Sequence, residues 1–159
     1  MKLVYYPDKA LETKCEPVTE FNEDLNNLLD GMKQVMLTNN GLGLSANQVS
    51  VLKRIMVIQT VKKEIYELIN PVLLDGEGLV SMSEGCLSAT SIYLNIERPA
   101  SVMFQYQDRT GEIKKAMAEG IEARTFLHEL DHLNGVFYFS KVNRQTRKIA
   151  LSKLKKALR

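Results

Sequence analysis

Long apolar stretches are absent from this sequence. No run approaches the roughly 18 apolar residues that a membrane-spanning helix needs, so we expect no transmembrane segment and no membrane partner. The opening residues, 1–7, also lack the apolar core of a secretion signal and the Arg- and Ser-rich character of an organelle transit sequence. These absences predict a cytoplasmic protein.

Cysteine and histidine are scarce as well. The chain has only two cysteines, Cys15 and Cys86, and only two histidines, His128 and His132. In a reducing compartment two cysteines argue against a structural disulfide. Burial, metal binding and catalysis remain as possible roles for each thiol, and the residues around it must decide between them.

The overall balance is that of a folded domain, with an uneven distribution of charge. Charged residues make up 25% of the 159 residues, and there are no repeats or linkers, so we expect one domain over residues 1–159. From Lys141 to Arg159 there are eight basic and no acidic residues, whereas residues 1–140 carry 13 basic and 19 acidic ones. A basic tail of this kind is typical of contact with an anionic surface.

Apolar periodicity predicts helices at both ends of the chain and one near residue 128. Apolar residues at helical spacing between Leu25 and Met36 predict a first helix, with Asn22 as its N-cap and 39–41 as its end. A second helix is expected over about 121–134, ended by Gly135. A third, amphipathic and basic, is expected over 144–158, with Ile149, Leu151, Leu154 and Leu158 on its apolar side.

The residue pattern in the middle of the chain predicts short strands. We expect strands at 55–59, 65–69, 72–74, 79–81, 101–107 and 112–118, with turns at 75–78 and 108–111. The predicted fold is therefore α+β. Antiparallel or mixed sheets surround a central helix, with one helix before them and an amphipathic helix after them.

The second predicted helix carries His128-Glu129-Leu130-Asp131-His132. Residues four apart lie on one face of a helix, so both imidazoles can bind one metal ion. Glu129, beside the first ligand, can take a proton from a water molecule that the ion has made more acidic. Two randomly placed histidines would show this spacing with a following Glu on the order of 1 time in 1,000, so a pair of ordinary histidines is a poor explanation.

Two further segments offer the remaining parts of a catalytic site. A catalytic metal usually has three protein ligands, and Cys86 in the segment 84–88 is the best third candidate, although a lone cysteine is more often a small buried residue. In segment 41–48, Gly43 allows close backbone approach, and the Gln48 amide can donate a hydrogen bond to a developing oxyanion. Alone, this second segment could equally be a helix stop.

Together these three segments resemble the peptide deformylases. That family carries a G-x-G-L-A-A-x-Q, an E-G-C-L-S and an H-E-x-D-H segment, matched here by 41–48, 84–88 and 128–132. The stretches 6–8, 68–71, 97–99 and 133–135 also look like the family. The resemblance implies an enzyme that removes the formyl group from the N-terminal formylmethionine of nascent polypeptides and releases formate.

The resemblance also implies roles for individual residues. Cys86, His128 and His132 would hold one divalent ion, in the family commonly Fe(II), with Zn(II), Ni(II) or Co(II) as substitutes. Glu129 would be the general base and then the acid. The Gln48 side chain and the backbone N–H of Leu87 would stabilise the oxyanion.

Substrate contacts follow from the same segments. Gly43 would face the bound peptide, and Leu42, Ile121 and Thr125 are candidates for the methionine pocket, although core packing explains these three residues equally well. Glu84 is a further candidate for the substrate site. The family pattern also suggests an ion pair between Glu84 and Arg98, and Asp131 is expected to support the ligands rather than the metal.

The sequence departs from the family pattern in places. Ser45 replaces the usual Ala, Ala89-Thr90 replaces an apolar residue and Pro, and Leu127 precedes His128 where bacterial members often have Gln. These changes put in doubt the loop after Cys86 and the subgroup, but not the reaction.

Other functions and partners stay open at this point. A metallopeptidase or another amidase could use the same helix, but would leave the other two motifs unexplained. A degenerate, metal-stabilised ribosome-binding module would be expected to have lost Glu129 or Gln48, and both are present. In bacterial deformylases a C-terminal helix docks near the ribosome exit tunnel, so the basic helix 143–159 is expected to contact rRNA phosphates, although simple packing on the body also explains it.

Overall fold

The computed structural model describes all residues from Met1 to Arg159. Short 3-10 helices occur at Lys9–Glu12, Ala46–Val49 and Tyr138–Lys141. The helices and strands are α1 (Glu23–Thr38), β1 (Gly43–Ser45), β2 (Ile55–Gln59), β3 (Ile65–Glu77), β4 (Val80–Cys86), β5 (Ala89–Arg98), β6 (Ser101–Gln107), β7 (Ile113–Glu119), α2 (Gly120–Leu133) and α3 (Arg144–Ala157).

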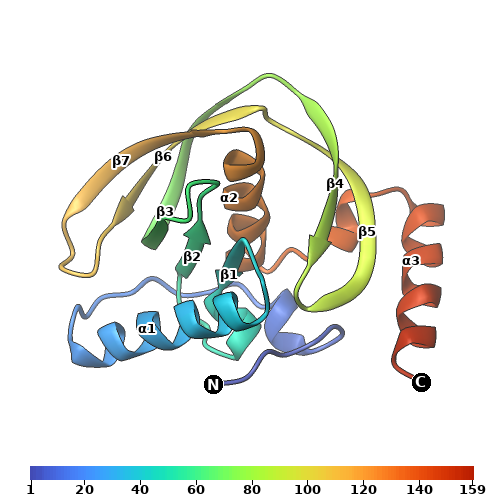
Figure 1. Cartoon of the computed structure of the whole chain (residues 1–159), viewed down its shortest axis with the longest axis horizontal. Helices are drawn as coiled ribbons and strands as arrows, with labels where there is room; N and C mark the ends of the chain where they lie inside the picture. The colour runs from blue at the N-terminus through green and yellow to red at the C-terminus, as the bar shows by residue number, and fades with distance from the viewer.

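The strands form two antiparallel sheets. The larger has the order β1-β2-β3-β6-β7, and the smaller is the β4–β5 hairpin. Figure 1 shows α2 between the large sheet and this hairpin. The predicted α+β architecture, with a central helix carrying the two histidines, is confirmed.

The long strand β3 corrects two predictions. The expected strands at 65–69 and 72–74 are one strand, and the expected turn at 75–78 falls largely inside it. The pairing with β6 shifts between Ile69 and Val72, where Asn70 takes a positive φ of 50°. The Asn70 side chain accepts from the Val18 N–H at 2.8 Å and donates to the Val18 carbonyl at 2.9 Å. The side chain also donates to the Gln107 side chain of β6 at 2.8 Å, so Asn70 is anchored both to β6 and to the N-terminal segment where the strand bulges.

The β4–β5 hairpin was only partly foreseen. The expected strand at 79–81 is the beginning of β4, which continues to Cys86, and β5 was not predicted. Ile92, Leu94 and Ile96 are buried and alternate with exposed residues, as in a strand with one covered face. Cys86 pairs with Ala89, so the chain reverses at 87–88, immediately after the cysteine. The hairpin therefore fixes Cys86 at the end of a strand.

The central helix α2 packs its apolar side on the large sheet. Phe126 stacks on Phe104 of β6 with ring centroids 4.2 Å apart, and Leu130 and Leu133 join the same core cluster. The helix ends as expected, with Asn134 as C-cap and Gly135 at a φ of 73°. An added Cβ at Gly135 would lie 2.9 Å from the Lys14 backbone nitrogen, so this exit needs glycine.

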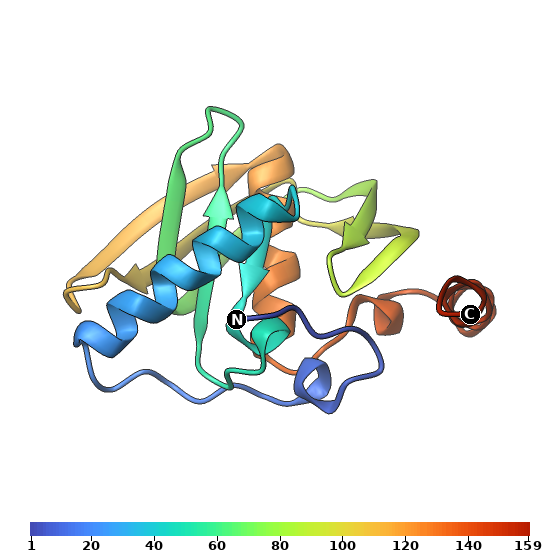
Figure 2. The same cartoon turned by 60° about the horizontal axis from the view of Figure 1, so that its bottom comes forward.

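The two outer helices begin where the sequence predicted. Asn22 caps α1 by accepting from the Leu25 N–H at 3.1 Å, and Asn143 caps α3 by accepting from Thr146 at 2.8 Å. Helix α1 packs over β1 and β2 in a second apolar cluster. Figure 2 shows α3 at the edge of the molecule, beyond the β4–β5 hairpin.

The predicted apolar side of α3 was partly wrong. Its buried residues are Ala150 and Leu154, which join the cluster around β5, and Leu151 packs against them. Ile149 and Leu158 are exposed instead. The helix is short and touches the body along one narrow stripe, so the apolar side inferred from the sequence was too wide. No helix of the structure is long and apolar enough to cross a membrane.

Candidate metal centre

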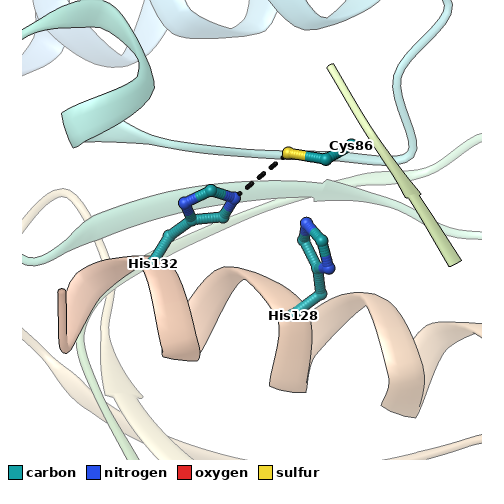
Figure 3. Close-up of side chains that lie close together, drawn as sticks. All are labelled: Cys86, His128 and His132. Carbon is teal, nitrogen blue, oxygen red and sulfur yellow. Dashed lines mark hydrogen bonds between the residues drawn. The ribbon is translucent and has the colours of Figure 1, made fainter. Parts of the chain in front are cut away.

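Cys86, His128 and His132 meet at one point. Their ligand-type atoms all lie within 4.8 Å of one another, and Cys86 Sγ is 3.3 Å from His132 Nε2. Figure 3 shows the sulfur above the two imidazoles of α2. The histidines are one helical turn apart on the side of α2 that faces the hairpin, and the turn at 87–88 fixes the cysteine. The structure thus brings together the three residues that the sequence proposed as ligands.

A buried carboxylate orients the first histidine. Glu84 Oε1 lies 2.9 Å from His128 Nδ1, which leaves Nε2 for the cluster. Glu84 also forms the expected ion pair with Arg98, at 2.7 and 3.0 Å. Burial alone would raise the pKa of Glu84, but the hydrogen bonds from His128 and Arg98 lower it to about 2. Glu84 is therefore a permanent anion behind His128.

The electrostatics of the cluster suit a cation. Burial alone would lower the pKa of both imidazoles. At His132 it does so, and the imidazole stays neutral, the form that binds a metal. At His128 hydrogen bonds with Cys86 and Glu84 outweigh burial and raise the pKa, so a positive charge is favoured beside the sulfur. One sulfur and two nitrogen donors form a set that transition metals accept. These residues fit a divalent metal ion.

Glu129 lies beside this cluster and is almost completely buried. One of its carboxylate oxygens, Oε2, has no hydrogen-bond partner. Burial raises the pKa of Glu129 to about 7. An added Cβ at Gly43 of β1 would lie 2.8 Å from Glu129 Oε1, so β1 can approach the carboxylate only through a glycine. A buried carboxylate with a free oxygen and this pKa is suited to moving a proton.

Gln48 aims its amide nitrogen at the cluster. Its Oε1 accepts from the Ser45 N–H at 3.0 Å, and because that backbone group is only a donor, the orientation of the amide is fixed. Nε2 then lies 3.2 Å from Ser88 Oγ and 3.7 Å from Cys86 Sγ. The neighbouring Leu87 N–H makes no hydrogen bond to the rest of the chain. Two donors therefore lie beside the proposed metal site.

A cleft of about 590 Å³ opens onto these groups. Leu42, Ile121 and Thr125, the residues expected at the methionine pocket, all line it. Thr125 Oγ1 donates to the Ile121 carbonyl at 2.8 Å, which turns the Thr125 methyl toward Gly43. Glu84 also lines the cleft, but both of its oxygens are engaged by His128 and by arginines. Asp131 accepts from Arg98 at 2.8 Å, so it supports the arginine that holds Glu84.

Sequence reasoning missed several polar residues around the site. Asn47 donates to the His132 carbonyl at 2.6 Å, and Ser45 and Ser88 hold Gln48. Arg124, buried on α2, contacts Glu84 at 2.8 Å. A signal for Arg124 was available, because a charged residue four positions before His128 lies on the same inward face of the helix.

Comparisons with known proteins agree with this geometry. The model of the polypeptide deformylase family matches residues 1–148.

The chain belongs to the peptide deformylase family.

The chain is 37% identical over 159 residues to the peptide deformylase of Thermodesulfovibrio yellowstonii, an alignment that covers 98% of this chain and 96% of the relative. It is 42% identical over 137 residues to that of Caldanaerobacter subterraneus, covering 86% of each chain. The crystal structure of a peptide deformylase from Legionella pneumophila superimposes with a TM-score of 0.94 at 34% identity, covering 98% of this chain and 93% of the other. The protein is a metal-dependent hydrolase that removes the formyl group from nascent peptides.

Proposed function

We propose that Cys86, His128 and His132 hold one divalent metal ion and that this ion is Fe(II) in the native enzyme, with Zn(II), Ni(II) and Co(II) as substitutes. The observation that carries this assignment is the convergence of the three donors, within 4.8 Å, beside the unpartnered oxygen of Glu129. A thiolate makes the donor set softer than an all-nitrogen site and unlike that of typical zinc peptidases. Because thiolate and imidazole also bind Zn(II) well, the proposal of Fe(II) follows the family resemblance and not the donor set.

Glu129 carries the protons of the reaction. When bound, the ion lowers the pKa of water and polarises the formyl carbonyl. Glu129 takes a proton from the attacking water as the new C–O bond forms at the formyl carbon. The C–N bond then breaks, and Glu129 returns that proton to the leaving nitrogen. The products are formate and a peptide with a free amino terminus.

Two donors stabilise the negative charge that develops on the formyl oxygen. Gln48 Nε2 is held in place by Ser45 and Ser88, and the Leu87 N–H is free to donate. Because both groups are fixed before the reaction begins, they need no reorganisation in the transition state. These donors lie next to Cys86, where the formyl group must sit to reach water near the three ligands.

The cleft selects the first residue of the peptide. We assign the methionine side chain to the part of the cleft wall formed by Leu42, Ile121 and the Thr125 methyl, which offers apolar contacts. Gly43 lies on the edge strand β1, whose free side can pair with an extended peptide. Glu84 supports His128 instead of contacting the substrate, because both of its oxygens are engaged.

An assay on formyl-Met-Ala-Ser tests these roles. Protein purified without oxygen and loaded with Fe(II) should release formate, and Glu129→Ala should lower the rate by at least about 100-fold. Glu112→Ala, which removes an exposed carboxylate far from the cleft, is the matched control and should keep full activity. Absence of formate release with Fe(II), Ni(II) and Co(II) would refute the assignment.

We propose that residues 1–159 act as one catalytic domain in the cytoplasm. The basic helix α3 brings this domain to the ribosome. Its basic side chains, including Arg144, Lys148 and Lys155, are exposed, and the body of the protein is acidic. Ribosomal RNA presents phosphates that such a helix can bind, with an affinity that falls as salt rises.

Charge reversal tests this contact better than deletion, because Ala150 and Leu154 of α3 are buried. The variant Arg144→Glu/Lys148→Glu/Lys155→Glu should weaken cosedimentation with ribosomes at low salt while the rate on formyl-Met-Ala-Ser is kept. The control Lys62→Glu/Lys63→Glu/Lys115→Glu makes the same change of charge elsewhere on the surface and should bind as the wild type does. Equal ribosome binding by the wild type and the α3 variant would reject the contact.

A further inference from the structure

Arg124 is a buried guanidinium in the wall of the cleft, and the reaction described above does not use it. It lies on α2 one helical turn before His128 and is only 4% exposed. A buried arginine needs partners for its donors, and it carries a high desolvation cost without them. Its contacts therefore show what this side chain holds in place.

The guanidinium joins α2 to both strands of the hairpin. It donates to Glu84 Oε2 at 2.8 Å, to the Ile96 carbonyl of β5 at 2.8 Å and to the Val80 carbonyl of β4 at 2.6 Å. One side chain thus connects three acceptors on two strands. The planar fork of arginine can do this, whereas the single ammonium of lysine cannot match the same geometry.

The hairpin and α2 share the proposed metal ligands between them. Cys86 ends β4, and the two histidines are on α2. The distance between sulfur and imidazoles therefore depends on how the hairpin is fixed against the helix. Arg98 reaches Asp131 near the C-terminal end of α2, and Arg124, two turns earlier on the helix, reaches the Val80 carbonyl in the same part of the hairpin.

Arg124 also completes the support of His128. Glu84 Oε1 accepts from Arg98 and faces His128 Nδ1, while Arg124 and Arg98 share Oε2. With both arginines present, the carboxylate is held from two sides and cannot turn away from the imidazole. Removing Arg124 leaves one arginine on Glu84 and takes away the side-chain donors to the Ile96 and Val80 carbonyls.

We propose that Arg124 is a positioning residue that sets the spacing between Cys86 and the two histidines and keeps Glu84 on His128. The inference rests on the proposed metal-binding role of those three residues. Residues that orient metal ligands typically contribute 10- to 100-fold to metal affinity. Arg124→Met, which keeps an unbranched stem in the cleft wall, should therefore weaken Co(II) binding by about 10- to 100-fold.

Two readouts separate positioning from a general loss of stability. In metal-free protein titrated with Co(II), the variant should show a weaker dissociation constant and an altered cobalt absorption spectrum, because the spectrum reports the ligand geometry. At saturating metal, kcat should fall about tenfold while KM for formyl-Met-Ala-Ser changes less, because the stem still lines the cleft. Arg124→Lys should give an intermediate affinity, and it decides the question if Arg124→Met does not fold.

Arg109→Met is the matched control. Arg109 also binds a carboxylate, Glu67, at 2.9 Å, but on the surface of the large sheet and away from the cleft. This variant should lose some stability and keep the Co(II) affinity and spectrum of the wild type. If both Arg124 variants fold and also keep them, the positioning role is rejected.

A different result would instead reject the metal assignment. Wild-type protein that binds no Co(II), or Cys86→Ser protein with an unchanged cobalt spectrum, would show that the metal is not held by Cys86, His128 and His132. The failure of the proposed site can thus be told apart from the failure of the role of Arg124.

Discussion

The two sides of α2 are buried to the same degree but are built from opposite kinds of residue. Toward the large sheet the helix presents Phe126, Leu130 and Leu133, which pack on other apolar side chains. Toward the cleft it presents His128 and Glu129 among other polar groups, nearly as inaccessible to solvent. The apolar side is stabilised by transfer from water alone, whereas each buried polar atom needs its own partner.

The polar side is satisfied everywhere except next to the proposed chemistry. Glu84, Arg98 and Arg124 form a closed network of ion pairs and hydrogen bonds. Glu129 Oε2 and His132 Nδ1 are left without partners. The comparison teaches that the free Glu129 oxygen, which lies beside the three proposed ligands in an otherwise complete network, marks where a ligand or substrate is needed, because such an atom costs stability that the fold alone does not recover.

The largest expected effect is a loss of activity when one group on the polar side of α2 is changed. Glu129→Gln keeps the shape of the side chain and removes the proton acceptor. The rate should fall by about 10²- to 10⁴-fold. Thermal unfolding should occur at the same or a higher temperature, because a buried carboxylate without a full set of partners is replaced by a neutral amide. Loss of both activity and stability would contradict the proposed division of roles between the two sides of α2.

The matching change on the apolar side should act on stability. Phe126→Ala removes a ring stacked on Phe104 and should lower the free energy of unfolding by about 3–5 kcal/mol. Denaturant unfolding measures this loss. The folded fraction should still bind Co(II), since Phe126 contacts none of the three proposed ligands. Loss of metal affinity greater than the loss of folded protein would show that the two sides are coupled.

The substitution Gly43→Ala should moderately lower both the stability and the activity of the protein. The new methyl would lie 2.7 Å from Thr125 Cγ2 and 2.8 Å from Glu129 Oε1, so the carboxylate must shift. We expect a loss of about 1–3 kcal/mol in stability, typical of overpacking, together with a clear fall in kcat on formyl-Met-Ala-Ser. As a control, Gly120→Ala adds a methyl where no atom lies within 4 Å, although its positive φ of 60° adds backbone strain. Activity retained in Gly43→Ala would show that Glu129 can move without cost.

The smallest effect on stability is expected from a change in the network of ion pairs around Glu67 at the surface. Lys33 and Arg109 bind Glu67 at 2.8 and 2.9 Å. Burial alone would raise the pKa of Glu67, but these hydrogen bonds outweigh it and lower the pKa. A lowered pKa stabilises the fold above the ordinary carboxyl range, and this stability is lost as the pH falls through the folded-state pKa.

The variant Glu67→Gln isolates that contribution. At pH 7 it should be less stable than the wild type by less than about 1 kcal/mol, since the partners are partly exposed. The difference should shrink below about pH 4 and activity should stay unchanged. Unfolding curves at several pH values measure it. A pH-independent difference would mean that packing, and not charge, makes the contribution.

The structural predictions that were confirmed depended on residues close to one another in the sequence. The caps Asn22 and Asn143 and the glycine exit at Gly135 are local signals, and the helices they bound were predicted to within about one residue at each end. The strand β5 was missed because its apolar alternation is preceded by no turn signal. The bulge at Asn70 was read as a break because its hydrogen-bond partners lie 52 and 37 positions away.

The sequence by itself determined the reactive groups and which of them share a helix face. His128, Glu129 and His132 are placed by the 3.6-residue period alone, and the three motifs together indicated the family. Only the tertiary structure decided that Cys86 reaches those histidines, that Glu84 is fully engaged behind His128, and that Arg124 holds the hairpin to α2. These are contacts between elements about 30 to 50 residues apart, and their geometry depends on how the hairpin packs on α2, which no local pattern of residues encodes.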